Sequence, residues 1–241
     1  MKLAGIDLAW QGERNPSAIA FGSIKHNRLI LESLEPAVYG LARIIEQLTK
    51  KESLQGIAID APLIIKNDTG QRLCEKALSR EYGGRKASCH TSNKRLYPEA
   101  LSVELSSVLQ THGFNHLAPS KWQIECYPHP AIIECFNLPE RLAYKKGSVA
   151  ERKAGQIELA RLILSLEHSK VLPLTLPKNL KGLLSATYIE TLKGISLKSN
   201  EDALDAIVCL YIAGLYSIKA DGIVYGDKAL GYIFVPKAYC F

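Results

Sequence analysis

The chain has 241 residues, of which 47% are hydrophobic and 22% are charged, and its formal net charge is +6. This length suits one large domain, or a core with one insertion, and the composition excludes a disordered or low-complexity protein. No apolar run approaches the roughly 18 residues that a membrane span needs. Residues 1–7 reach a charge too soon for a signal peptide. We therefore expect a cytoplasmic protein without a membrane partner.

The six cysteines form no C-x-x-C pair, so neither a disulfide framework nor a zinc ribbon is indicated. A zinc site made of Cys89, His90, Cys126 and His129 is disfavoured, because their spacing fits no compact zinc motif.

Most of the positive charge lies in one segment, residues 72–95. The segment contains seven basic residues and two acids, so its formal net charge is 7 − 2 = +5. Such a patch would suit a phosphate-bearing partner, and a solvated basic surface explains the charge equally well. The basic residues are Arg72, Lys76, Arg80, Arg85, Lys86, Lys94 and Arg95, and the acids are Glu75 and Glu81.

Residues 3–10 form the first predicted strand, which is short and apolar, carries Asp7 and stops before a turn at Gln11-Gly12. Residues 17–24 and 28–34 are typical of two further strands joined by a turn at 25–27, so we expect an antiparallel meander. After Pro36, apolar residues at positions 41, 44, 45 and 48 predict a helix, and residues 56–60 predict a fourth strand. A strand, helix and strand in this order favour a parallel pair, which would place Asp7 and Asp60 at the same sheet edge.

Residues 66–121 are the least regular part of the chain, with one predicted helix at 98–109, and we interpret them as an insertion or cap. Residues 122–128 predict a fifth core strand that carries Glu125. Helices are predicted at 129–136, 150–168, 178–193 and 201–216, followed by short strands at 222–225 and 231–235. The pattern indicates a single α/β domain over residues 1–241. We expect a mixed five-stranded central sheet flanked by helices, with the first three strands antiparallel and the fourth and fifth parallel to the first.

Four aspartates lie in these apolar elements: Asp7, Asp60, Asp202 and Asp205. An ionised carboxylate is costly to bury without a partner, so each of them needs a cation, a metal ion or a hydrogen-bond network. Asp202 and Asp205 would share one face of a helix and could reach an ion held by the other two. Oxygen ligands without His or Cys favour Mg²⁺ or Mn²⁺, and two such ions can promote phosphodiester cleavage.

Each acid also has a structural explanation. Ser199-Asn200-Glu201-Asp202 matches a capping box, so Asp202 could bond backbone N–H groups at a helix start. Asp60 could form an Asx-type turn before Ala61-Pro62, and Glu125 could pair with a lysine or arginine. All of these explanations would have to hold together, so the set of acids is stronger evidence than any one of them.

The arrangement of these acids along the chain is similar to that of the ribonuclease-H-like superfamily, especially Holliday-junction resolvases. More closely, the chain resembles domain of unknown function family 429 (DUF429), whose members are predicted nucleases of ribonuclease-H-like fold. The resemblance rests on motifs that span nearly the whole chain in order. They are Gly5-Ile6-Asp7-Leu8-Ala9-Trp10, Ile59-Asp60-Ala61-Pro62-Leu63, Arg72-x-Cys74-Glu75, Glu125-x-Tyr127-Pro128-His129, Tyr144-Lys145 with Arg152, Asp202-Ala203-Leu204-Asp205-Ala206, and Gly231-Tyr232-Ile233-Phe234-Val235-Pro236.

The resemblance implies that Asp7, Asp60 and Asp205 are metal ligands, and that Asp202 and Glu125 are further catalytic acids. It implies Mg²⁺ or Mn²⁺ as the cofactor and nucleic acid, DNA or RNA, as the partner. Resolvase-like relatives suggest a homodimer by analogy. The chain departs from the family pattern at Glu75, where the family often has Asp. This difference leaves the role of the motif Arg72-x-Cys74-Glu75 open.

Five basic positions need roles beside these acids. From the residues themselves, we assign Arg72, Lys145 and Arg152 to binding phosphate or neutralising the acids, with structural ion pairs as an equal alternative. Lys94 and Arg95 are weaker candidates for the same role.

The leading hypothesis is a metal-dependent nuclease. A phosphotransferase related to sugar kinases and actin would need a Gly-rich phosphate loop where Trp10 stands. A non-catalytic nucleic-acid-binding module would keep the acids as a structural cluster, although the basic segment has only Tyr82 and Tyr97 to stack on bases. A Cys hydrolase that uses Cys74 or Cys126 with His129 has no local signature.

Overall fold

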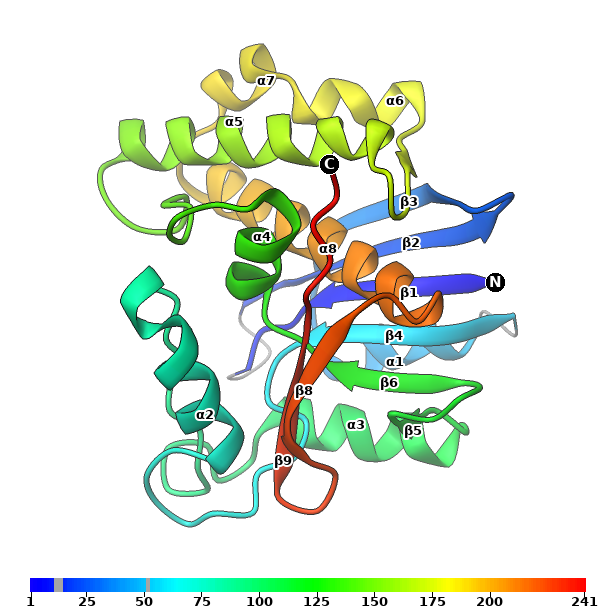
Figure 1. Ribbon diagram of the computed structural model, residues 1–241, viewed down its shortest axis with the longest axis vertical. Helices are drawn as coiled ribbons and strands as arrows, with labels where there is room; N and C mark the ends of the chain where they lie inside the picture. Colours follow the sequence, from blue (N-terminus) through cyan, green and yellow to red (C-terminus); the bar gives the residue numbers. More distant parts are fainter. Residues whose placement is uncertain (11–14, 51–52) are drawn as a thin grey trace.

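A seven-stranded mixed sheet forms the centre of the molecule, and helices cover both of its faces (Figure 1). The computed structural model describes residues 1–10, 15–50 and 53–241. The turn expected at Gln11-Gly12 lies outside these residues. The strand order is β5-β6-β4-β1-β2-β3-β7. The strands are β1 (Lys2–Asp7), β2 (Ser17–Lys25), β3 (Arg28–Val38), β4 (Leu54–Asp60), β5 (Asn115–His116), β6 (Trp122–Glu125) and β7 (Leu174–Thr175).

The five longer strands pair as the sequence predicts. β1, β2 and β3 form an antiparallel meander, whereas β4 pairs parallel to β1 and β6 pairs parallel to β4. The strand count was wrong, because β5 and β7 add one parallel strand at each edge. Each of these edge strands has only two residues, too few for an apolar alternation to be visible in the sequence.

The long helix α8 (Gly194–Ser217) crosses one face of the sheet and packs on β1, β2, β3 and β4. Its start was predicted seven residues too late, at 201. Lys193 is the N-cap residue, and its backbone N–H donates to Ser196 Oγ (3.1 Å). Asp202 therefore lies inside the helix, and the capping-box explanation for it is wrong.

Other helices complete the layers around the sheet. α1 (Leu41–Thr49) connects β3 to β4 and packs against α3 (Leu101–Thr111), while α4 (Pro128–Phe136) and α5 (Val149–Ser165) pack against α8. The single helix predicted at 178–193 is instead divided into α6 (Lys178–Lys181), a 3₁₀ turn (Gly182–Leu184) and α7 (Ala186–Thr191). The division falls at Ser185, which is extended and caps α7 through its side chain. None of the helices in the described ranges is long and apolar enough to cross a bilayer.

The segment 66–121 contributes to two parts of the structure. Its helix α3 and strand β5 belong to the layers of the main sheet. Its helix α2 (Leu73–Tyr82) packs instead on the C-terminal hairpin of β8 (Gly222–Asp227) and β9 (Gly231–Pro236), with a small apolar cluster between them. This second cluster lies at the sheet edge where the parallel strands β1, β4 and β6 end (Figure 1).

Candidate metal centre

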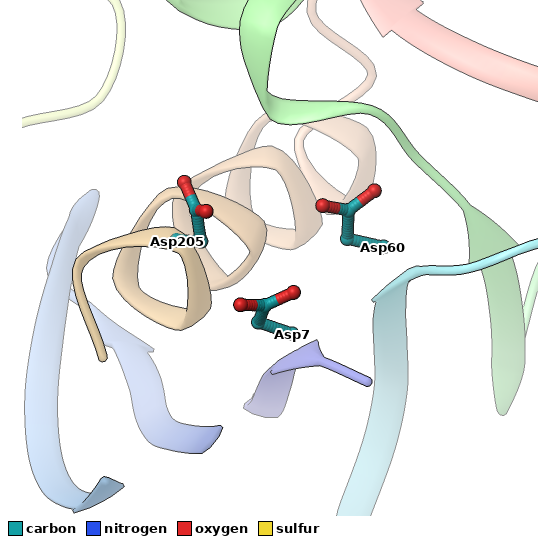
Figure 2. A group of neighbouring side chains, drawn as sticks. All are labelled: Asp7, Asp60 and Asp205. Atoms are coloured by element: carbon teal, nitrogen blue, oxygen red, sulfur yellow. The ribbon is translucent and has the colours of Figure 1, made fainter. Parts of the chain in front are cut away.

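Three aspartates converge at the carboxyl ends of β1 and β4 (Figure 2). Asp7 and Asp60 are the last residues of these strands and face each other in register, and Asp205 reaches them from α8. One carboxylate oxygen from each lies within 4.8 Å of the others. Among the described residues, this is the one group of three or more His, Cys, Asp or Glu side chains close enough to hold a metal ion. The structure thus brings the predicted ligands together, and their role as ligands stays a prediction.

Two glycines allow this convergence. Gly5 lies in β1 beneath α8, and a Cβ there would overlap the backbone of Ala206 and Leu210, so glycine lets the helix that carries Asp205 approach the strand that carries Asp7. Gly155 plays a similar role on α5, where a Cβ would overlap the backbone at Ala143 and Tyr144. The first approach brings Asp205 to Asp7, and the second lets the backbone of Tyr144, whose hydroxyl bonds to Asp205, lie against α5.

The environment of the triad disfavours ionised carboxylates. Burial raises the pKa of Asp7 well above its usual range, and the charges of Asp205, Asp60 and Asp202 add to the rise while Lys145 opposes it. Burial likewise raises the pKa of Asp60 to about 7. Desolvation and like-charge repulsion both disfavour the ionised form, so a cation that approached this point would be bound in exchange for protons.

Two residues of one loop already contact Asp205. Tyr144 donates its hydroxyl hydrogen bond to one carboxylate oxygen (2.7 Å), and Lys145 Nζ lies 2.6 Å from the other. Burial alone would lower the pKa of Lys145, but the neighbouring acids raise it well above its usual range, so this amine is charged. The Lys145 side chain is 27% exposed and therefore also reaches the solvent side of the site.

The donor set fits a hard divalent cation. Three carboxylates and one ammonium leave a formal charge of −2, and the ligand atoms are oxygens only, which Mg²⁺ and Mn²⁺ prefer. No side chain in the described ranges donates a hydrogen bond to the carboxylates of Asp7 or Asp60, so these two groups keep their lone pairs for an ion.

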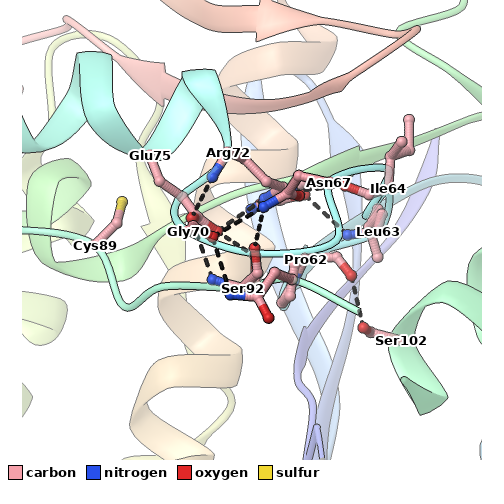
Figure 3. A network of polar contacts seen from close by, with 12 residues as sticks. Pro62, Leu63, Ile64, Asn67, Gly70, Arg72, Glu75, Cys89, Ser92 and Ser102 are labelled. Atoms are coloured by element: carbon pink, nitrogen blue, oxygen red, sulfur yellow. Dashed lines mark hydrogen bonds and ion pairs between the residues drawn. The ribbon is translucent and has the colours of Figure 1, made fainter. Parts of the chain in front are cut away.

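Glu125 and Arg72 lie in a neighbouring buried network, part of which Figure 3 shows around Arg72 and Glu75. Arg72 donates to both oxygens of Glu125 (2.9 and 2.5 Å) and also to Glu75 (2.8 Å). Leu63 N–H donates to Glu125, and Ser92 donates to Glu75 through its backbone and hydroxyl groups. Arg72 is 3% exposed, so this geometry matches the ion-pair alternative for Arg72 and Glu125. It also gives Glu75 a structural role.

Asp202 and Arg152 form ion pairs at the edge of the site. Asp202 accepts from Lys198 (2.7 Å), one helical turn before it, and is close enough to raise the pKa of Asp7. Arg152 pairs with Glu201 (3.3 Å). Asp202 therefore lies close to the triad, and both residues already have partners of opposite charge.

Much of the basic segment is also paired. Arg85 contacts Glu134, Lys86 contacts Glu140 and Lys94 contacts Asp68. Within the described ranges, Lys76, Arg80 and Arg95 make no ion pair and are the remaining free charges of the segment.

The alternatives based on cysteine lose support. Burial raises the pKa of Cys74 to about 12, and burial also raises that of Cys126, whose thiol donates to Cys209 (3.6 Å). Protonated buried thiols are poor nucleophiles and poor zinc ligands.

A cleft of about 270 Å³ opens beside Asp7 and Asp60, and its lining includes residues for which the sequence predicted no role in the site. Trp10 lines it and donates its indole N–H to the backbone oxygen of Asp60 (3.2 Å). Arg141, Lys146 and Tyr144 line it from the loop between α4 and α5. In the sequence, the one clue to this loop is the motif Tyr144-Lys145. Two residues are too few to predict how the loop folds back to the cleft.

Comparison with known proteins gave a family but no individual relative. The search of curated proteins and the search of solved structures found no match. A family model described as "Protein of unknown function (DUF429)" matches residues 5–226, which include all three aspartates of the triad. The chain therefore belongs to the DUF429 family.

Proposed function

We propose that the protein is a Mg²⁺- or Mn²⁺-dependent nuclease that hydrolyses phosphodiester bonds in nucleic acid. The observation that carries this proposal is the convergence of Asp7, Asp60 and Asp205, with oxygens within 4.8 Å, beside an open cleft. A ribonuclease-H-like arrangement of the sheet is part of the same proposal. The meander followed by two parallel strands, with acids on β1, β4 and a late helix, supports it.

Asp7, Asp60 and Asp205 would hold the first ion, and Asp202, whose charge acts on Asp7, would serve a second one. Bound there, the ions would supply Lewis acidity that activates water and stabilises the leaving oxygen. The chain's own residues would do the positioning. Tyr144 fixes one oxygen of Asp205, and Lys145 offers a positive charge to a phosphate in the cleft.

A second candidate function is a non-catalytic nucleic-acid-binding or structural protein of the same fold. The ion pair between Lys145 and Asp205 favours it, because the chain itself supplies one cation to the acids. In that protein the residual charge would be met by protons on Asp7 and Asp60, not by a metal ion.

The test is activity and metal binding with one matched pair of variants. Purified protein with Mg²⁺ or Mn²⁺ should cleave DNA or RNA, and Asp7→Asn should abolish cleavage and Mn²⁺ binding in calorimetry. Asp221→Asn, which changes an exposed aspartate before β8, should leave both unchanged. Absence of Mn²⁺ binding at millimolar metal would exclude the nuclease and favour the second candidate.

A further inference from the structure

The cleft beside the triad has the dimensions of a small-ligand site. Its volume of about 270 Å³ lies just below the usual range for pockets that enclose drug-sized molecules. Such a cavity holds one ring system with its substituents, whereas a duplex needs an extended surface of phosphate contacts. Four of the seven basic residues of the segment 72–95 (Arg72, Arg85, Lys86 and Lys94) are paired with acids, so fewer of its charges are free for the phosphates of a duplex.

The lining of the cleft is mixed in charge: four acids (Asp7, Asp60, Glu75 and Glu125) and the paired Arg72 line it together with three basic residues of one loop. Arg141, Lys145 and Lys146 line it from one loop, next to Asp7 and Asp60. Arg141 and Lys146 form no ion pair with any described residue, so their charges are available to a ligand. Three basic side chains beside the proposed metal centre suit a phosphate group that contacts both the side chains and the metal ion.

The wall of the cleft also offers planar contacts and an unpaired polar atom. Trp10, His90 and Tyr127 line it, and His129 packs between the rings of Tyr127 (5.6 Å between centroids) and Tyr144 (5.2 Å). His129 is 6% exposed, and its Nδ1 is buried without a hydrogen-bond partner among the described residues. Burial lowers the pKa of His129 to about 3, so the ring is neutral and can accept or donate one hydrogen bond. A buried polar atom that lacks a partner is costly. Nδ1 is closed off from solvent, so it gains a partner from a ligand only if the ring turns toward the cleft that His129 lines.

We propose that this cleft binds one unpaired nucleotide, with the phosphate between the triad and Arg141, Lys145 and Lys146, and the base against the aromatic wall beside His129. The proposal rests on the nuclease function and names its substrate class. The substrate is single-stranded nucleic acid or a frayed end, because a base held in a duplex cannot enter the cleft. Aromatic side chains bind an unstacked base through its face, whatever its sequence.

The binding test uses the full chain with Mn²⁺ and three probes: thymidine 5′-monophosphate, deoxyribose 5-phosphate, which lacks the base, and a covalently closed duplex plasmid. We expect the nucleotide to bind about tenfold or more tightly than the sugar phosphate. His129→Ala should abolish that difference, and His129→Gln, which keeps a polar atom, should restore part of it. Lys146→Ala, at an exposed position that folding does not need, should weaken both small probes equally. His168→Ala, an exposed histidine remote from the cleft, is the matched control.

Two results would overturn the nucleotide site: equal affinity for nucleotide and sugar phosphate, or wild-type affinity for the nucleotide in both His129 variants. Cleavage assays separate this proposal from the nuclease function. If the closed plasmid is cut as fast as a linear single strand, the protein is a nuclease and the single-nucleotide cleft is refuted. A second outcome is that neither DNA is cut, while the nucleotide binds to the wild type and His129→Ala abolishes this binding. That outcome would refute the nuclease function and support the nucleotide site.

Discussion

Replacing Asp60 with Asn tests whether the triad stores electrostatic repulsion that a metal ion relieves. Burial raises the pKa of Asp60 from 3.8 to about 7, and Asp205 and Glu125 add to the rise. The folded state therefore holds this proton more tightly than the unfolded chain does. Stability from this group falls as the pH rises from 3.8 towards 7, and the full cost of ionised Asp60 is present above about pH 7.

The magnitude follows from the difference between the two pKa values. A rise of 7 − 3.8, or about 3 units, corresponds to about 4 kcal/mol at 1.36 kcal/mol per unit. Without metal, Asp60→Asn should therefore raise the free energy of unfolding by up to about 4 kcal/mol at pH 8. At pH 5 the gain should shrink to less than about 2 kcal/mol, because only the interval from 3.8 to 5 then contributes. Mn²⁺ at a hundred times its Kd should stabilise the wild type by about 2.7 kcal/mol and the variant not at all.

Urea denaturation followed by circular dichroism, at both pH values and with and without Mn²⁺, measures all of these terms. Asp221→Asn is the control for the loss of an exposed carboxylate and should change the free energy of unfolding little at either pH. The reasoning would be refuted if metal-free Asp60→Asn were less stable than the wild type at pH 8. Equal stabilisation of the two proteins by Mn²⁺ would refute the role of Asp60 as a ligand.

Three further substitutions distinguish basic residues that stabilise the fold from those that act in the site. Arg72→Ala leaves Glu75 and Glu125 buried without their partner, so it should cost about 3–5 kcal/mol of unfolding free energy, whereas exposed Lys94→Ala should cost less than about 1 kcal/mol. Urea denaturation measures both, and a loss below 1 kcal/mol for Arg72→Ala would show that the network of Figure 3 is not needed for the fold. Lys145→Gln removes the cation beside Asp205, so Mn²⁺ should bind about tenfold more tightly in calorimetry while nucleic-acid cleavage falls. Weaker Mn²⁺ binding in this variant would contradict the view that Lys145 and the ion compete for the same negative charge.

The five longer strands of the sheet could be predicted because they are short apolar runs separated by recognisable turns and one amphipathic helix. That order of elements already placed Asp7 and Asp60 side by side, and the observed register pairs them directly. The N-terminal turns of α8 were harder to predict. Residues 194–200 are mostly polar and contain Ser199, which mimics a cap, while the true cap depends on Ser196 and the backbone of Lys193. Local patterns cannot rank two such caps.

The triad could be predicted because an acid in an apolar element is unusual enough to require an explanation. The partners of Glu125 could not be predicted in the same way. Arg72 is 53 residues away along the chain, and only the packing of the loop before α2 shows that it binds Glu125 and not a phosphate. The roles proposed for Arg141 and Lys146 depend on how the loop after α4 returns to the cleft, where Tyr144 bonds to Asp205. The role proposed for His129 depends on its packing in α4 against Tyr127 and Tyr144.

The two buried acid clusters of this protein differ in a way that supports different roles. Glu75 and Glu125 share Arg72, and backbone N–H groups and a serine hydroxyl complete their hydrogen bonds, so the chain already satisfies them. The triad has one cation, Lys145, and one hydroxyl, Tyr144, and both are bound to Asp205. Across the described residues, the carboxylates of Asp7 and Asp60 receive no such donor, although they lie in the same apolar surroundings and line the cleft. An acid cluster that the chain satisfies needs no ligand, whereas one left with a net negative charge at an opening requires protons or a cation from outside. This contrast is why we propose a metal ion at the aspartates and interpret the glutamates as structural residues.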